Sequence, residues 1–412
     1  MPSVNLCFRI HQPYQFRNYC FGDIGKLHLY DDRVAMATIM DKLADNCYLP
    51  ANKILLEQIR KANGKFRVSF SLSGTTLELF EQFRPDLVGS FRQLVQTGCV
   101  EITGETYYNS FSWLHSPSEF DRQVKEHDAL VKKLFGYEPM VFRNTELIHD
   151  NELAKHIAAL GYKGMLVEGN SGLLNGRSPN QSYAAPGNGD FGLLLRNAAL
   201  SEDITCLYGK GKGSRYALTA VKFAERVFHD HTGNSCSINL FLDYETFGIH
   251  KTGQSMFTFL EELPGAILAD PAYSFKTLTE ALDYCYPKDI YDVPATFSMG
   301  NGYGINYALC DGVKQHEVLK KLYRFESLVH ASGDERLLNT WGKLQSAEHF
   351  CFIAGSSLPG IHTYQFAGQV NYTVEKYQQI ANILTDFEIS LITAGVETSK
   401  KRFSRQLSAM LF

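Results

Sequence analysis

Strand-like and helix-like segments alternate along nearly three hundred residues of this chain, and this alternation limits the folds open to it. Val4–Ile10 and Phe66–Leu72 alternate apolar with other residues at a period of two, which is typical of strands. Further short apolar runs lie at 100–103, 140–142, 165–167 and 238–242. Helical patterns separate these runs, at 52–61, 118–135, 152–160 and 218–228. Repeated strand–helix–strand units predict a parallel sheet covered by helices.

The predicted sheet can be an open, doubly wound sheet or a barrel. No Gly-x-Gly-x-x-Gly follows the first strand, so a dinucleotide-binding open sheet has no support. A barrel of roughly 250 residues would take up most of the 412-residue chain. Beyond Tyr286-Pro287 the strand patterns stop and helical patterns follow, at 316–329, 335–352 and 373–392. We therefore predict an α/β domain at residues 1–295 and a helical domain at 296–412. Residues 170–197, rich in Gly, Asn, Ser and Pro, are expected to form a long loop.

Charge and composition narrow the class of protein. The chain has 40 basic and 44 acidic side chains, so it lacks the positive excess that binds nucleic acid. No run of eighteen apolar residues occurs, and the N-terminal residues do not resemble a secretory signal. The nine cysteines contain no Cys-x-x-Cys pair. We expect a cytoplasmic protein with reduced thiols, no membrane partner, and no metal or other cofactor. The oligomeric state stays open.

Polar residues follow several of the predicted strands. His11 follows the first strand, Glu101 lies in the third, and Arg143 and Glu146 come at the end of the fourth. Asp243 ends the strand that begins near residue 238. Because the ends of parallel barrel strands lie on one face, these side chains are expected to converge there, where α/β-barrel enzymes carry their active sites.

Two converging carboxyl groups can cleave a glycosidic bond with retention, one as nucleophile and the other as acid and then base. Glu146 has Arg143 three residues before it, and a nearby guanidinium favours the ionised form that a nucleophile needs. Asp243 lies among apolar and aromatic residues, which suits a group that must keep its proton. Glu245, two residues further on, is a rival for the same role.

Four segments resemble, in order, the motifs of the glycoside hydrolase family 57 α-amylases and 4-α-glucanotransferases. They cover roughly residues 1–265 and read His11-Gln12-Pro13, then residues 98–105 (GCVEITGE), 142–147 (FRNTEL) and 241–248 (FLDYETFG). The resemblance implies an incomplete (β/α)7 barrel followed by a helical domain, and a retaining mechanism on α-1,4-glucans. It implies Glu146 as nucleophile, Asp243 as general acid/base, and His11 as a contact to substrate hydroxyls.

Further residues are candidates for binding the glucan. Glu101 and Arg143 lie inside the motifs, and Ser346-Ala347-Glu348-His349-Phe350 loosely matches a motif of the helical domain, with Glu348 where the family usually has Asp. With only two Trp in the chain, a stacking platform must rest largely on Tyr. The rings expected at the floor of a sugar cleft are Tyr107, Tyr108, Trp113, Tyr244 and Phe247.

Three alternatives to a glucan hydrolase stay open on the sequence alone. The same carboxylates could serve a 4-α-glucanotransferase. A metal-dependent carbohydrate deacetylase on a similar barrel would need His11 to join other ligands, with His115 and His149 as candidates. A glucan-binding protein without activity would fit the departures from the family pattern, such as Pro294–Gly300 in place of a Trp-containing stretch.

Overall fold

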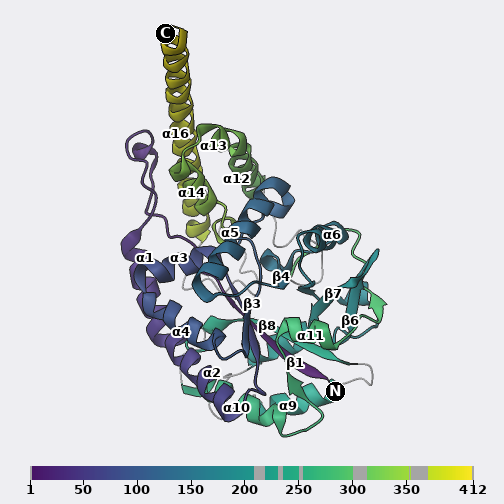
Figure 1. Ribbon diagram of the computed structural model, residues 1–412. Coiled ribbons are helices and arrows are strands. Elements are labelled where there is room, and N and C mark those ends of the chain that lie inside the picture. The colour runs from purple at the N-terminus through teal and green to yellow at the C-terminus, as the bar shows by residue number, and fades with distance from the viewer. Residues whose placement is uncertain are drawn as a thin grey trace.

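A computed structural model describes residues 2–207, 219–230, 235–249, 254–299, 313–351, 353 and 370–410. Seven parallel strands form the centre of the molecule (Figure 1). They are β1 (Ser3–Ile10), β2 (Val68–Leu72), β3 (Val100–Ile102), β4 (Val141–Arg143), β5 (Gly164–Glu168), β7 (Asn188–Arg196) and β8 (Ser237–Asp243). Three short strands extend the sheet, namely β6 (Ser182–Ala185), β9 (Ser274–Phe275) and β10 (Asp289–Ile290).

The seven parallel strands pair in the ring β1-β2-β3-β4-β5-β7-β8 and back to β1. Two neighbouring strand pairs in this ring are joined by a single residue pair each. A single bridge between Gly104 and Phe142 joins the end of β3 to β4, and only Arg196 and Asn239 are in register between β7 and β8. The arrangement is the incomplete (β/α)7 barrel that the family resemblance implies. Every strand of the ring points the same way, so all carboxyl ends lie on one face.

Helices surround the barrel, and a short one fills its base. The outer helices are α1 (Arg33–Leu43), α2 (Leu49–Lys61), α3 (Gly74–Phe83), α4 (Pro85–Val95), α5 (Pro117–Phe135), α6 (Asn151–Ala159), α7 (Ser171–Leu174), α8 (Ala198–Glu202), α9 (Ala220–His229) and α10 (Gln254–Leu268). Helix α11 (Leu278–Tyr284) packs Leu278 and Ala281 into an apolar cluster inside the ring, with Cys7, Val141, Leu147, Leu166, Leu194 and Phe241. Active-site side chains can therefore gather only at the opposite end of the barrel.

The sequence explains where helix α5 begins. Ser116 caps the helix, because its hydroxyl accepts a hydrogen bond from the amide of Glu119. Pro117 takes the first helical position, where a missing amide hydrogen costs nothing. Gly136 ends the helix in the left-handed conformation, with φ 66°. The predicted helix at 118–135 is thus confirmed, one residue longer.

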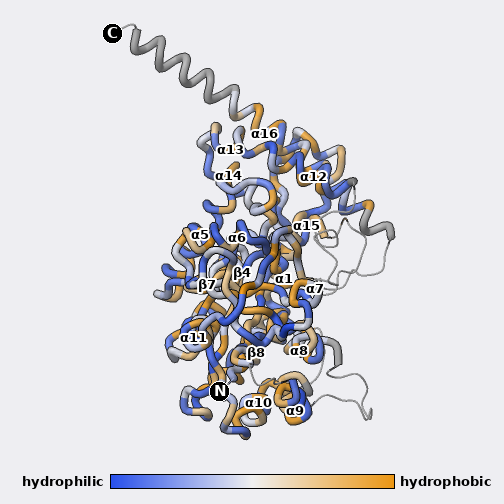
Figure 2. Tube along the Cα trace, turned by 90° about the vertical axis from the view of Figure 1, so that its right-hand side faces the viewer, coloured by the Kyte–Doolittle hydropathy of each residue, from blue (hydrophilic) through white to orange (hydrophobic). Residues whose placement is uncertain are grey.

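A helical region lies across the end of the barrel away from the N-terminus (Figure 2). It consists of α12 (Val313–Arg324), α13 (Glu326–Ser332), α14 (Glu335–Leu344), α15 (Ala347–Cys351) and α16 (Val370–Met410). Its core surrounds Trp341, which is fully buried and donates to the carbonyl of Leu322. Phe111 and Ile148 of the barrel's loops belong to the same core. The predicted boundary near 295 falls between β10 and α12, and it stays a prediction.

Two sequence-based expectations are wrong. Residues 170–197 are not one long loop, because they hold α7 and the antiparallel pair β6–β7. Cys236 and Cys285 form a disulfide, with Cα atoms 6.0 Å apart, so the thiols are not all reduced. None of the helices in the described ranges is both long and apolar enough to cross a membrane.

Candidate active site

Arg9 lies at the centre of a cluster of three carboxylates at the carboxyl end of the barrel, of which Glu146 and Glu348 are buried. Its Nη2 atom is 2.9 Å from Glu348 Oε1 and 3.4 Å from Glu146 Oε1, and its Nη1 atom is 3.4 Å from Asp243 Oδ1. Arg9 lies in β1, and its three partners come from the turn after β4, the end of β8 and helix α15. The fold therefore brings Glu146 and Asp243 to one guanidinium, as the sequence predicts for a carboxylate pair.

Glu146 occupies a tight turn directly after β4. Its backbone is left-handed, with φ 51° and ψ 28°, and Leu147 follows at φ 50°. Such conformations are strained for residues with a Cβ and persist only where the surroundings hold them. Here the carbonyl of Glu146 accepts from the amide of Met299, 2.7 Å away. The turn aims the Glu146 carboxylate at Arg9.

Burial raises the pKa of Glu146, and the positive charges of Arg9 and Arg143 oppose that rise. Among the described residues, Glu146 Oε1 accepts no hydrogen bond and meets only the 3.4 Å ion contact with Arg9. The carboxylate thus has an oxygen that is not committed to another donor, as an attacking group requires.

Asp243 ends strand β8, directly beside Arg9 in the register of the two parallel strands. Its side chain is 17% exposed, against 4% for Glu146, so the cluster is reached from solvent on the Asp243 side. Glu245 is buried behind it and accepts from Gln12 Nε2 at 3.1 Å and from the Tyr48 hydroxyl at 2.5 Å. Burial and the charge of Asp243 raise the pKa of Glu245 to about 7.

Glu348 and His11 form a second ion pair in the cluster. His11 Nε2 lies 2.8 Å from Glu348 Oε2, and His11 Nδ1 lies 2.6 Å from the hydroxyl of Ser73. Burial alone would raise the pKa of Glu348, but the charges of His11 and Arg9 lower it to about 2. Helix α15 is held in place by the amide of Ala347, which donates to the carbonyl of Asn109. The helical region therefore supplies one carboxylate of the site.

Arg143 lies beneath the cluster and is almost completely buried. Its guanidinium is bonded to Ser71 Oγ at 2.9 Å and to Asn109 Oδ1 at 3.1 Å, and it lies 3.3 Å from Glu105 Oε2. Through these contacts Arg143 holds Ser71, Asn109 and Glu105 in place beneath the site.

Three predicted binding residues lie apart from the carboxylate cluster. Glu101 accepts from the amides of Leu278 and Thr279, and so caps helix α11 inside the barrel. Trp113 donates to Asp150 at 3.3 Å and packs against Phe120 and His156. Tyr244 is fully buried.

The rings expected to floor a sugar cleft are mostly core residues. Tyr244 donates to Asn52 of α2 and packs against Phe8 and Phe70. Tyr107, Tyr108 and Phe247 are also buried. Of the five rings, only Trp113 is even partly accessible. The expected floor of five rings is therefore not present in this arrangement.

Sequence reasoning missed Arg9, the centre of the cluster. The signal was present, because alternate residues of a strand share a face and Arg9 is two residues before His11. The hydroxyls of Ser73 and Ser346, both hydrogen-bonded to His11, were missed as well. Ser346 comes from the helical region, and only the fold brings it to β1.

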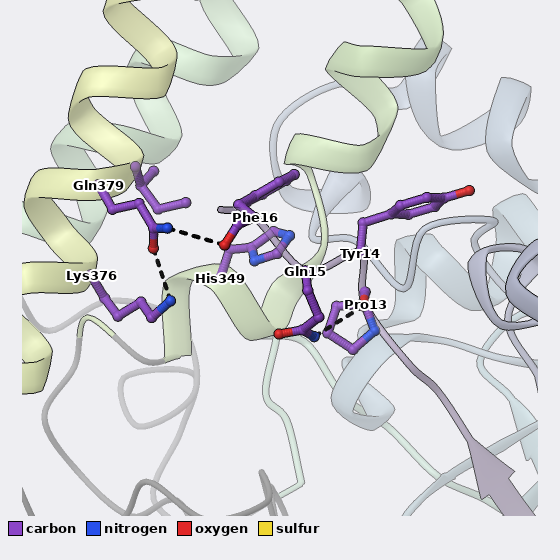
Figure 3. A pocket seen from close by; sticks show the side chains of 8 residues that line it. Pro13, Tyr14, Gln15, Phe16, His349, Lys376 and Gln379 are labelled. Atoms are coloured by element: carbon purple, nitrogen blue, oxygen red, sulfur yellow. Dashed lines mark hydrogen bonds between the residues drawn. The ribbon is translucent and has the colours of Figure 1, made fainter. Parts of the chain in front are cut away.

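A small pocket is lined by residues 13–16, His349 of α15 and residues of α16 (Figure 3). His349 faces this pocket and packs on Phe16, with ring centroids 4.5 Å apart. Gln379 bridges the walls, since it accepts from Lys376 and donates to the carbonyl of Phe16. The cavity volume is about 30 Å³, on the scale of a few waters.

The structure thus combines a (β/α)7 barrel with three carboxylates that surround one guanidinium on the carboxyl-end face of the strands. The sequence profile of Glycosyl hydrolase family 57 matches residues 5–294. The chain is 30% identical over 398 residues to a protein of Methanocaldococcus jannaschii named "Putative alpha-amylase", which covers 93% of this chain and 84% of that protein. The chain therefore belongs to glycoside hydrolase family 57.

Solved structures with the same fold share little sequence with this chain. The 4-alpha-glucanotransferase of Thermococcus litoralis superposes with a TM-score of 0.68 at 16% identity, over 93% of this chain and 59% of that one. An alpha-amylase of Thermotoga maritima superposes with a TM-score of 0.64 at 13% identity, over 98% of this chain and 96% of that one. At such identities the likeness establishes the fold, and the chain spans well under two thirds of the T. litoralis enzyme.

Proposed function

We propose that the protein is a retaining glycoside hydrolase acting on α-1,4-glucans, with Glu146 as nucleophile and Asp243 as general acid/base. The observation that carries the proposal is the approach of both carboxyl groups to one guanidinium, Arg9, at 3.4 Å each. A retaining mechanism requires two carboxyl groups on either side of one glycosidic bond. The names of the M. jannaschii and T. maritima relatives support α-glucans as the substrate class.

The proposed roles follow from the surroundings of each carboxyl. Burial raises the pKa of Glu146, and the guanidinium groups of Arg9 and Arg143 counter this by favouring the ionised form that attacks the anomeric carbon. Asp243 is the more exposed of the two, so it can meet the leaving oxygen and later an incoming water. Glu348 contacts both Arg9 and His11. We propose that His11 contacts substrate hydroxyls and that Glu348 fixes the orientation of its ring.

The cluster itself favours a glycosidase over a metal-dependent deacetylase. A deacetylase would need His and Asp ligands around a metal-activated water. Here the Arg9 guanidinium lies between the three carboxylates, and both ring nitrogens of His11 are hydrogen-bonded. Of the other candidate ligands, His149 is fully buried and packs against Tyr291, and His115 packs against Tyr323.

The proposal is tested by incubating the purified protein with maltoheptaose and separating the products by chromatography. We expect shorter products from the wild type, and at least about 1,000-fold slower turnover in Glu146→Gln and Asp243→Asn. Glu152→Gln, at an exposed carboxylate of α6, is the matched control and should keep full activity. Longer products would indicate a 4-α-glucanotransferase, and binding without any product would indicate a glucan-binding protein. Wild-type turnover in both site variants would refute the assigned roles.

A further inference from the structure

The guanidinium of Arg9 contacts the two proposed catalytic carboxyls through different nitrogen atoms. Nη2 faces Glu146 Oε1 and Nη1 faces Asp243 Oδ1, both at 3.4 Å. We propose that Arg9 is a positioning residue that supports whichever of the two carboxyls is ionised as the reaction proceeds. This inference rests on the proposed function and adds to it a residue that neither motif nor chemistry assigned.

The negative charge changes place during a double displacement. In the first half, an oxygen of Glu146 bonds to the anomeric carbon, the bond from that carbon to the glycosidic oxygen breaks, and the proton of Asp243 passes to that oxygen. Glu146 is then a neutral ester and Asp243 is an anion. In the second half, a water gives its proton to Asp243 and its oxygen to the anomeric carbon, and Glu146 leaves as the carboxylate. The pair carries one negative charge throughout.

The position of Arg9 is fixed by its neighbours, so its guanidinium can contact both carboxyls while the negative charge moves from one to the other. Its guanidinium is a planar fork with nitrogens on two sides, whereas a lysine offers one point charge. The third carboxylate, Glu348, holds Nη2 at 2.9 Å and takes no part in the charge transfer. The strand register fixes Arg9 beside Asp243. The cation therefore needs no rearrangement between the two halves, which is the condition for effective electrostatic support.

Other charged groups also face the pair, from every element packed around it. Arg143 of β4 acts on Glu146 from below, and Glu348 of α15 adds a negative charge beside it. Glu245, after β8, lies near Asp243. His11 pairs with Glu348. Arg9 is the group of this set with a direct ion contact to both Glu146 and Asp243 in the described residues.

The test compares two substrates that differ in their need for a proton. Maltoheptaose needs the proton of Asp243 on its leaving oxygen, whereas α-maltosyl fluoride releases fluoride without that help. We expect Arg9→Gln to lower kcat/KM for maltoheptaose about 100-fold and to lower it for the fluoride at least about tenfold less. Without the cation the pKa of Glu146 rises, so the acidic limb of the kcat/KM profile should move to higher pH. Arg9→Lys keeps the positive charge, so it should return the acidic limb of the kcat/KM profile to its wild-type pH. It should restore only part of the rate on maltoheptaose, because lysine cannot contact both carboxyls at once.

The proposal is overturned if Arg9→Gln lowers kcat/KM equally on maltoheptaose and on α-maltosyl fluoride and the acidic limb of the profile does not move. Arg9 would then have only a packing role. That result is separable from failure of the proposed function. If Glu146→Gln is inactive, the function stands and only the role of Arg9 is wrong. If Glu146→Gln keeps wild-type turnover, the function and this inference both fail. The double variant Arg9→Gln/Glu348→Gln removes both members of an ion pair and so leaves neither charge buried without its partner. It replaces Arg9→Gln in the comparison if the single variant does not fold.

Discussion

His11 Nε2 lies 2.8 Å from Glu348 Oε2, which joins the first strand of the barrel to a helix near the other end of the chain. The pair shows how the active-site face is completed. The barrel provides the imidazole and the Arg9 guanidinium, and the helical region provides the carboxylate between them. The Glu348 carboxylate therefore reaches Arg9 and His11 only when the helical region is docked on the barrel.

This pair predicts an acid sensitivity. The folded protein lowers the pKa of Glu348 from 4.5 to about 2, so its stabilising effect is present above about pH 4.5 and is lost as pH falls toward 2. The loss corresponds to roughly 3 kcal/mol for that shift. In urea unfolding between pH 6 and 3, Glu348→Gln should therefore lose less stability than the wild type. Glu152→Gln, at an exposed site, should follow the wild type, and parallel curves for all three proteins would contradict the prediction.

Glu245 predicts the opposite dependence on pH. Its pKa is raised from 4.5 to about 7, mainly by burial and further by Asp243, so the fold favours the protonated form. The resulting stabilisation is present below about pH 4.5 and is lost as pH rises through 7.

Glu245→Gln keeps an oxygen for the donors of Tyr48 and Gln12 but cannot ionise. Its stability relative to the wild type should therefore rise between pH 4.5 and 8, by roughly 3 kcal/mol at most. Chemical unfolding at the two pH values measures the change. The gain should shrink in an Asp243→Asn background, because the second cause of the shift is then absent. No change with pH in either background would show that Glu245 ionises freely in the folded protein.

The Cys236–Cys285 pair predicts a redox-dependent stability. The disulfide links the start of β8 to the residue after α11, across 49 positions of sequence, and closing such a loop restricts the unfolded chain. Cys236→Ser should lower the free energy of unfolding by roughly 2–4 kcal/mol under oxidising conditions. Added dithiothreitol should lower the melting temperature of the wild type and leave the variant unchanged. Cys20→Ser, at an exposed free thiol, is the control. An identical response of both variants would argue against the pairing.

The barrel and the convergence of Glu146 and Asp243 could be predicted from the sequence because both depend on local patterns. Period-two alternation placed β1 and β2, and a short apolar run placed β8. Parallel strand ends bring Glu146 and Asp243 to one face whatever the details of packing. Arg9 was missed because a single charge in a strand is ordinarily on the solvent side. The same alternation puts Arg9 on the face of β1 that carries Cys7, and this face points into the barrel.

The errors at Tyr244 and Glu101 share a physical origin in the direction and depth of the side chains, and the error at β6 and β7 has another. Tyr244 follows Asp243, so it leaves the sheet on the other face, where its ring packs in the core against α2. Glu101 lies on the inner face, but at a depth where it meets the amino end of α11. Strands β6 and β7 were missed because Gly and Asn at their turn resemble a loop, although residues 191–196 are buried.

The contact between Gly342 and Tyr108 yields a last prediction, on the docking of the helical region. Gly342 lies in α14 against the ring of Tyr108, and a Cβ at this position would come closer to that ring than any real contact. Gly265 lies in the last turn of α10, directly after Pro264, with open space around it. Alanine ordinarily stabilises a helix interior by about 1 kcal/mol relative to glycine.

Gly265→Ala should therefore raise the free energy of unfolding by up to about 1 kcal/mol. Gly342→Ala should lower it by about 2 kcal/mol, because overpacking the buried Tyr108 outweighs the gain in helix propensity. The displaced helix also carries the chain into α15, so kcat/KM on maltoheptaose should fall in Gly342→Ala and stay unchanged in Gly265→Ala. Calorimetry and product assays on both variants measure these effects. Equal stabilisation by the two alanines would mean that α14 does not press on the barrel at Tyr108.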